Sequence, residues 1–92
     1  MNLTEIEIKK LIEKDLNGWE LIDSKLVKFI PRVSGKSLGD IVKNIWDYAE
    51  KVDHHPDILL TYSGIQITLI THDKSGITEK DMKFALNLRN LY

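Results

Sequence analysis

The feature that most constrains the fold of this chain is an alternating segment that follows a short turn. In residues 65–71 every second residue is Ile, Leu or Thr, and most residues between them are polar. This period of two is typical of a strand with one buried face. Ser63-Gly64 suits a tight two-residue turn, and residues 58–62 form a second β-rich run before it. The sequence therefore predicts an antiparallel hairpin in the second half of the chain.

A second hairpin is predicted earlier. Residues 19–23 and 26–31 are short β-rich runs, and the polar pair Asp23-Ser24 separates them. Pro31 ends the second run.

Helical patterns lie before, between and after the hairpins. Thr4 with Glu7, and Thr78 with Asp81, have the spacing of capping boxes at helix starts. Asn17-Gly18 predicts the end of the first helix. The helix between the hairpins runs from Leu38 to about Asp53, and we expect its apolar residues to form one buried face: Leu38, Ile41, Val42, Ile45, Trp46, Ala49 and Val52. Trp46 is assigned to the core on this pattern.

The element order is αββαββα. Segregated hairpins and helices predict an α+β fold with a four-stranded antiparallel sheet and the helices packed on one face. With 92 residues, the chain is expected to be a single domain, residues 1–92. So small a domain is modestly stable alone, and we expect a homo-oligomer, either a dimer that extends the sheet or a tetramer built through helices.

Charge and composition exclude several classes of function. The net charge of −1 gives no basic surface for direct nucleic-acid binding, and no apolar run approaches the length of a membrane span. No signal peptide is visible, so a cytoplasmic location is expected. The chain has no cysteine, which excludes disulfides, thiolate metal sites and a cysteine nucleophile.

The candidate site is built from the three histidines of the chain. His54 and His55 are adjacent and precede Pro56, and His72 follows the alternating strand. The outward strand from Asp57 has six residues and the returning strand has seven, so the hairpin should bring His72 back beside the other two. Histidine is the side chain that exchanges protons near neutral pH, which favours an acid–base site.

Glu50 lies four residues before His54 on the predicted helix, where its carboxylate can orient the imidazole and favour the protonated form. An exposed surface pair is the alternative interpretation. A zinc site is a further alternative, but adjacent histidines suit one metal poorly. No serine or threonine is placed as a nucleophile. Proton transfer without a metal remains the preferred interpretation.

The spacing of these residues resembles the signature of the pterin-4a-carbinolamine dehydratases. The matching residues are Glu50, then His54-His55-Pro56 after three residues, Tyr62 after five, His72 after nine, and finally Asp81. The resemblance covers nearly the whole chain, and the αββαββα order is also that of the family.

The resemblance implies an activity and a set of roles. Members of the family dehydrate 4a-hydroxytetrahydrobiopterin to quinonoid dihydrobiopterin, without metal or cofactor, and so recycle the pterin of aromatic amino acid hydroxylases. His54 and His72 would share the acid and base roles, and His55 would hold the pterin. Asp81 is expected to cap its helix and Tyr62 to pack at the hairpin. Substrate-binding or supporting roles are expected for Glu50, Asp53, Pro56, Asp57, Thr71 and Asp73.

The chain departs from the family at three positions. Ile58 stands where the family usually has an aromatic residue, Leu60 where asparagine is frequent, and Asp53 where asparagine is frequent. Asp53 would add negative charge beside His54. We therefore expect dehydratase chemistry in a pocket whose walls differ.

Two other functions stay open at this level. Some relatives of this fold act as non-enzymatic dimerisation or assembly factors for other proteins, and the apolar surface of a small sheet would suit that role. A pterin-binding role in molybdenum cofactor handling is the other.

Overall fold

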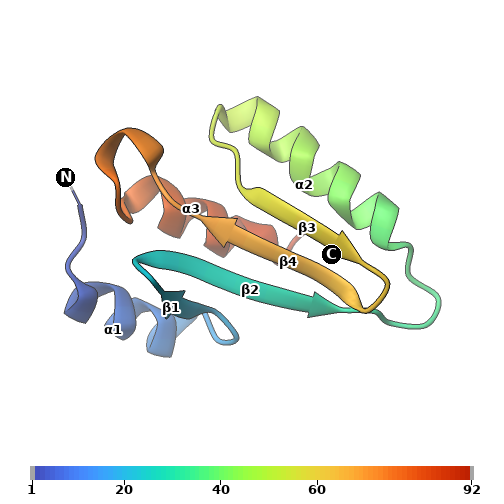
Figure 1. Cartoon of the computed structure of the whole chain (residues 1–92), viewed down its shortest axis with the longest axis horizontal. Coiled ribbons are helices and arrows are strands. Elements are labelled where there is room, and N and C mark those ends of the chain that lie inside the picture. Colours follow the sequence, from blue (N-terminus) through green and yellow to red (C-terminus); the bar gives the residue numbers. More distant parts are fainter. Residues whose placement is uncertain (1, 92) are drawn as a thin grey trace.

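The fold is described from a computed structural model, and the structure describes residues 2–91. Three helices and one sheet follow the expected order (Figure 1). The elements are α1 (Glu5–Asp15), β1 (Glu20–Ile22), β2 (Lys25–Pro31), α2 (Leu38–Val52), β3 (Asp57–Thr61), β4 (Gly64–Leu69), the short 3-10 helix η1 (His72–Lys74) and α3 (Glu79–Leu88). The strands are antiparallel in the order β1-β2-β4-β3. The predicted α+β fold is confirmed.

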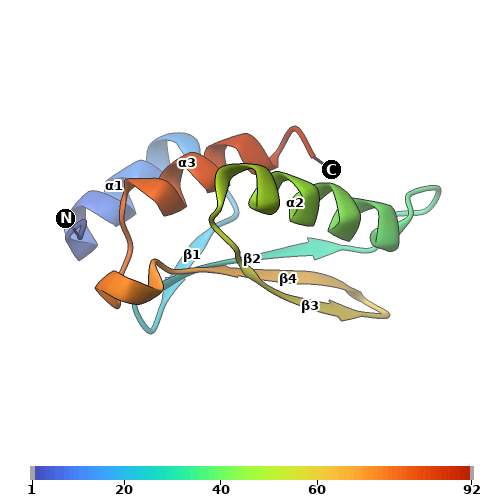
Figure 2. The ribbon, with the colours of Figure 1, turned by 90° about the horizontal axis from the view of Figure 1, so that it is seen from above.

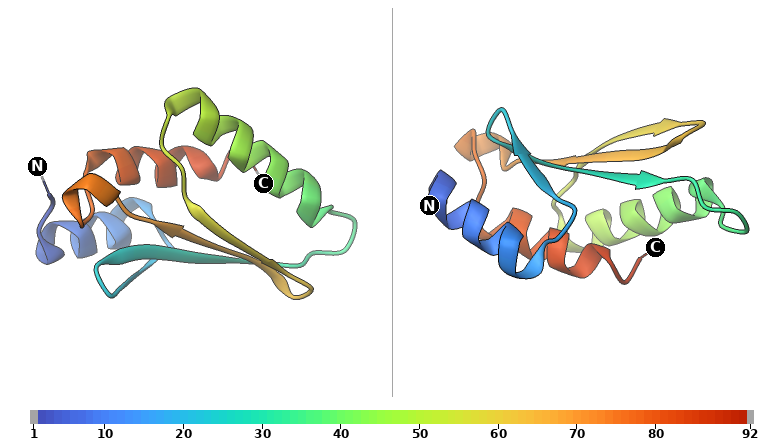
Figure 3. Two further views of the ribbon diagram at one scale, coloured as in Figure 1. Left: turned by 45° about the horizontal axis from the view of Figure 1, so that its top comes forward. Right: turned by 90° about the horizontal axis from the view of Figure 1, so that it is seen from below.

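The helices form one layer and the sheet forms the other, as an edge-on view shows (Figure 2). The two views of Figure 3 show the same arrangement, with the opposite face of the sheet left uncovered by helices. The core lies between the layers. Its most deeply buried members come from the central strands and the helices above them: Leu26, Ile45, Ala49, Ile65, Ile67, Leu69, Phe84 and Leu88.

The alternating strand behaves as its pattern predicts. Ile65, Ile67 and Leu69 are fully buried under the helices, whereas Gln66 faces the open side. The turn lies one residue earlier than predicted, because Thr61 pairs with Gly64 and the connecting residues are Tyr62 and Ser63. Gly64 belongs to β4, where it also pairs with Pro31 of β2.

The first hairpin turns at the predicted pair. Asp23 and Ser24 have φ angles of 50° and 62°. Positive φ at both central residues is the requirement of the type I′ hairpin turn, and Asp tolerates it better than most residues.

Both predicted capping boxes are present. In α1 the side chain of Thr4 accepts from the backbone of Glu7, and the Glu7 carboxylate accepts from Thr4. Asp81 accepts from the backbone of Thr78 in the same way at α3. α1 ends at Asp15, earlier than the Asn17-Gly18 signal indicates.

The assignment of Trp46 to the core is wrong. The buried face of α2 consists of Leu38, Ile41, Ile45 and Ala49, whereas Trp46 is 42% exposed. Successive helical residues are rotated by 100°, so Trp46 lies beside this face rather than on it. Val52 lies on the buried face by its helical angle, but it is the last residue of α2 and is 43% exposed.

The structure also bears on membrane insertion. Of the helices described between residues 2 and 91, none combines the length and apolar character needed to cross a membrane.

Candidate active site

The three histidines lie on one cavity of about 430 Å³. The cavity is at the end of the molecule where α2 stops, β3 begins and the chain leaves β4 for η1 (Figure 1). Its lining residues are Trp46, Asp53, His54, His55, Pro56, Asp57, Thr71, His72, Asp73 and Lys80. The hairpin therefore returns His72 to the other two histidines, as the strand lengths predict.

The backbone at the end of α2 sets the direction of the two adjacent histidines. Asp53 is the C-cap of α2 in the left-handed conformation, with φ 52° and ψ 45°. This single residue turns the chain out of the helix, and Pro56 holds the next step extended. Asp57 then enters β3 opposite Thr68 of β4, which fixes the register between the two sides of the cavity.

His54 forms a short contact with a buried carboxylate. Its Nε2 lies 2.6 Å from Oδ1 of Asp81, which is fully buried, while the His54 side chain is 13% exposed. The capping-box spacing predicts only a helix-capping role for Asp81. It does cap α3, but its other oxygen serves that purpose, so one carboxylate joins the helix start to the histidine.

The donors around Asp81 define the tautomer of His54. Oδ2 of Asp81 accepts from Thr71 Oγ1 at 2.8 Å and from the Thr78 backbone N–H at 2.9 Å. An ionised carboxylate only accepts, so His54 must donate from Nε2. In its neutral form His54 then carries its lone pair on Nδ1, which is the atom left for proton exchange.

The threonines around Asp81 form a directed chain of hydrogen bonds. Thr71 uses its single hydroxyl proton on Asp81, so at the 2.7 Å contact with Thr78 Oγ1 it must accept. Thr71 and Thr78 are both buried, as is Asp81. Every polar group in this cluster therefore has a partner, which holds the carboxylate in one orientation.

The expected pairing of Glu50 with His54 is wrong. Oε2 of Glu50 lies 3.3 Å from Nε2 of His55 instead. The turn at Asp53 directs His54 away from the surface of α2 and towards α3. The imidazole of His55 therefore lies beside α2. Glu50 is the one predicted site residue that does not line the cavity; it supports His55 from outside.

His55 is also in contact with Trp46. The two ring centroids are 5.0 Å apart and the rings are tilted by 53°. Because Trp46 and Glu50 are one helical turn apart on α2, they flank the imidazole from the same element. Trp46 and Lys80 are cavity residues that the sequence interpretation missed. The signal available for Trp46 was its spacing of four residues from Glu50, which places the two side chains on the same side of a helix.

The remaining predicted residues divide as follows. His72 begins η1 with an exposed side chain, and Asp73 follows it. Tyr62 is 84% exposed rather than packed into the hairpin, with the Arg32 guanidinium 4.7 Å above its ring.

Within residues 2–91, no three His, Asp or Glu side chains are grouped as metal ligands.

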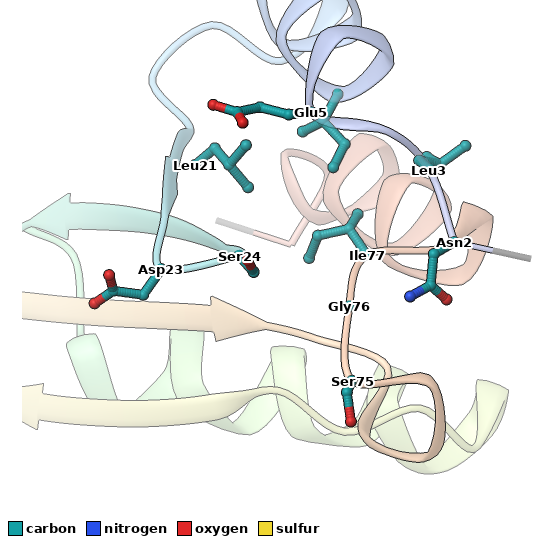
Figure 4. Close-up of a pocket in the computed structure, with 10 residues that line it drawn as sticks. Asn2, Leu3, Glu5, Leu21, Asp23, Ser24, Ser75, Gly76 and Ile77 are labelled. Carbon is teal, nitrogen blue, oxygen red and sulfur yellow. The ribbon is translucent and has the colours of Figure 1, made fainter.

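A second cavity, of about 260 Å³, lies between the start of α1, the β1–β2 turn and the segment before α3 (Figure 4). Leu21 and Ile77 line it, and its titratable residues are the carboxylates Glu5 and Asp23. Histidine does not occur in its lining. Of these two cavities, the histidine cavity is therefore the one equipped for proton transfer near neutral pH.

Comparisons with known proteins agree with this geometry. The family model described as pterin 4 alpha carbinolamine dehydratase matches residues 1–91. A Saccharolobus solfataricus protein, provisionally named a pterin-4-alpha-carbinolamine dehydratase, is 35% identical over 98% of this chain and 95% of its own length. A Mycolicibacterium vanbaalenii protein with the same provisional name is 40% identical over 80% of each chain.

A solved structure shares the fold. The crystal structure of a transcriptional coactivator/pterin dehydratase from Brucella melitensis aligns with a TM-score of 0.88 and 28% identity. The alignment covers 99% of this chain and 98% of the other. With the family model, the two relatives and the shared fold in agreement, this chain belongs to the pterin 4 alpha carbinolamine dehydratase family.

Proposed function

We propose that this protein dehydrates a pterin-4a-carbinolamine, 4a-hydroxytetrahydrobiopterin in the first instance, to the quinonoid dihydropterin, and so serves pterin recycling. The observation that carries the proposal is the meeting of three histidines on one open cavity, one of them held by a buried carboxylate. Family membership supplies the substrate class. We also propose that residues 1–92 form one domain and that the protein works in the cytoplasm.

The proposed reaction needs one acid and one base. The acid protonates the 4a-hydroxyl, which leaves as water with the electron pair of the C4a–O bond. A ring nitrogen supplies the electron pair for the new C=N bond, and the base takes the proton which that ring system releases. We assign these roles to His54 and His72, which line the cavity from two different segments, the α2–β3 connection and η1.

His55 and the acidic residues would bind the ring. Glu50 and Trp46 hold His55 on two sides, which fixes an imidazole suited to orienting a ligand. Asp53, Asp57 and Asp73 line the same cavity. Carboxylates accept hydrogen bonds, so they complement the ring N–H and amino donors of a pterin.

The test is a dehydration assay on freshly generated 4a-hydroxytetrahydrobiopterin, with wild-type protein and with His54→Ala, His55→Ala and His72→Ala. Removing a general acid or base should lower kcat by about 10²- to 10⁴-fold at His54 and His72. His55→Ala should mainly raise KM. A wild-type rate equal to the buffer rate would exclude the proposal.

A second function, in protein assembly, is favoured by a specific surface. β3 is an edge strand on which Leu59 is 56% exposed and Leu60 is 50% exposed. Unpaired edges with exposed apolar residues favour strand addition. We propose that this edge builds a homo-oligomer, and that it is the surface available to a partner protein if the chain acts as an assembly factor.

A further inference from the structure

We propose that the indole of Trp46 is the aromatic wall on which the flat ring of the ligand stacks, and that Trp46 thereby selects for a planar bicyclic heterocycle. The inference rests on the proposed function, because it concerns the same cavity and names how its ligand is held. Three observations support it.

The first observation is the exposure of Trp46. Its neighbour Ile45 is fully buried, whereas Trp46 is 42% exposed and lies on the histidine cavity. Tryptophan carries one of the largest apolar surfaces of any side chain, and leaving it in water forgoes the free energy of burial. The fold gains little from placing it here, and a ligand that covers the indole would recover that burial.

The second observation is the fixed position of the ring. The indole lies 5.0 Å from the imidazole of His55, centroid to centroid, and Glu50 contacts the same imidazole at 3.3 Å. Trp46 and Glu50 belong to α2, whose buried face anchors it to the sheet. An aromatic wall held by a rigid helix costs little conformational entropy when a ligand stacks on it.

The third observation is the chemistry of the other walls. Apart from Trp46 and Pro56, the lining residues are polar: Asp53, His54, His55, Asp57, Thr71, His72, Asp73 and Lys80. A fused heterocycle has polar edges and apolar faces, so it needs both kinds of wall. Ile58 does not line the cavity, and among the lining residues that the structure describes Trp46 is the only Trp, Tyr or Phe.

The test compares Trp46→Leu with Trp46→Phe, using 7,8-dihydrobiopterin as a stable ligand and 4a-hydroxytetrahydrobiopterin as substrate. Leucine keeps an apolar group but loses the ring, and should weaken binding and raise KM by about tenfold. Phenylalanine should restore both to within about threefold of wild type. In both variants kcat should change little, because the acid and base remain. Binding should also quench the fluorescence of Trp46 directly. The chain has two tryptophans, and Trp19 is buried in the core, so this measurement uses a Trp19→Phe background.

Different results overturn different claims. If the wild type turns over substrate and Trp46→Leu matches it in KM and ligand affinity, the stacking role is wrong and the proposed activity stands. If Trp46 emission responds to protein concentration but not to pterin, a second copy of the chain covers the indole and the stacking role is again wrong. If the wild type neither binds nor converts pterin, both claims fail. Val33→Ala, at another exposed apolar residue far from the cavity lining, is the control and should behave as wild type.

Discussion

At the scale of single residues, Asp81 combines a structural and a chemical task. One oxygen faces His54 and the other receives the Thr78 backbone and the Thr71 hydroxyl. Because the start of α3 and the histidine share this carboxylate, the position of the imidazole is tied to the integrity of the helix. The orientation of the candidate acid–base group therefore depends on a residue that never reaches the cavity.

Asp81→Asn is predicted to lower kcat by at least about 10²-fold. The asparagine amide can donate to Nε2 of His54, which would move the ring proton to Nδ1 and produce the wrong tautomer. The measurement is steady-state dehydration, together with urea unfolding to record the loss of stability.

Thr71→Val is the matched control for this prediction. It removes one buried donor from Asp81 but leaves the contact with His54, and should cost about 1–3 kcal/mol of unfolding free energy. Its kcat should fall far less than that of Asp81→Asn. Equal losses of kcat in the two variants would show that stability, rather than the tautomer, accounts for the effect.

At the scale of elements, the hairpins and the caps fix where each segment begins and ends. Gly64 is the critical residue of the second hairpin. It has a φ of +154° and lies so close to β2 that a Cβ atom would come 2.7 Å from Cζ of Phe29 and 2.9 Å from Cα of Pro31, and closer still to the Ile30 carbonyl. The pairing of β2 with β4 therefore requires glycine at position 64. The same pairing sets the register of β4, the strand that leads to the cavity.

Gly64→Ala is predicted to destabilise the protein by about 3 kcal/mol, from backbone strain and the displacement of β2. Gly35→Ala is the control, because Gly35 also has a positive φ, of +84°, but nothing lies within 4 Å of its Cβ position. It should cost about 1 kcal/mol. Chemical denaturation measures both, and equal losses would contradict the role of the close approach.

The capping box of α1 predicts a pH dependence. Hydrogen bonds from the Thr4 backbone N–H, and then from its side chain, lower the pKa of Glu7 from the usual 4.5. A lowered folded-state pKa gives stability that is present above pH 4.5 and is lost as the pH falls through the folded-state value.

Glu7→Ala should therefore lower Tm at neutral pH, and the difference from wild type should shrink as the pH falls below 4.5. Glu13→Ala, on the exposed side of the same helix and outside the capping box, is the control for removing a glutamate side chain. Thermal unfolding followed by circular dichroism between pH 3 and pH 7 measures both differences, and a constant gap for Glu7→Ala across this range would contradict the assignment.

At the scale of the whole molecule, the sheet is covered on one face only (Figure 2). Phe29 and Leu59 flank Gln66 across the open face, and both apolar side chains are about half exposed. A chain of 92 residues buries a limited core, so covering this surface by self-association would add stability. This surface supports the proposed homo-oligomer, and Leu59 belongs both to the open face and to the edge strand β3.

Leu59→Lys is predicted to dissociate that oligomer, because a charged residue on an edge strand opposes pairing. Light scattering should give a multiple of 10.6 kDa for the wild type and a smaller mass for the variant. Val33→Lys, which changes an equally exposed residue outside the strands, should keep the wild-type mass. A wild-type protein that is monomeric at micromolar concentration would contradict the proposal.

Local patterns in the sequence determined the elements of this protein. Hydrophobic period, turn residues and capping spacings depend on neighbours along the chain, so the order αββαββα, both capping boxes and the buried face of β4 could be predicted from them. The strand lengths around the second turn were also enough to place His72 near His54. The one-residue error at that turn arose because Gly64 is required by β2, which is distant in sequence.

The partners of the histidines depend on contacts between elements that are distant in sequence. Because of the left-handed turn at Asp53, His54 contacts Asp81 and His55 contacts Glu50. Helical spacing alone predicts that Glu50 contacts His54. Trp46 lies on the cavity wall and not in the core, because its position about 100° around α2 from Ile45 is beside the face that is buried against the sheet. The sequence thus determined which residues could carry the chemistry. Packing between α2, α3 and the hairpin determined which of these residues are in contact. No local pattern could predict these contacts, because they join segments that are far apart in the chain.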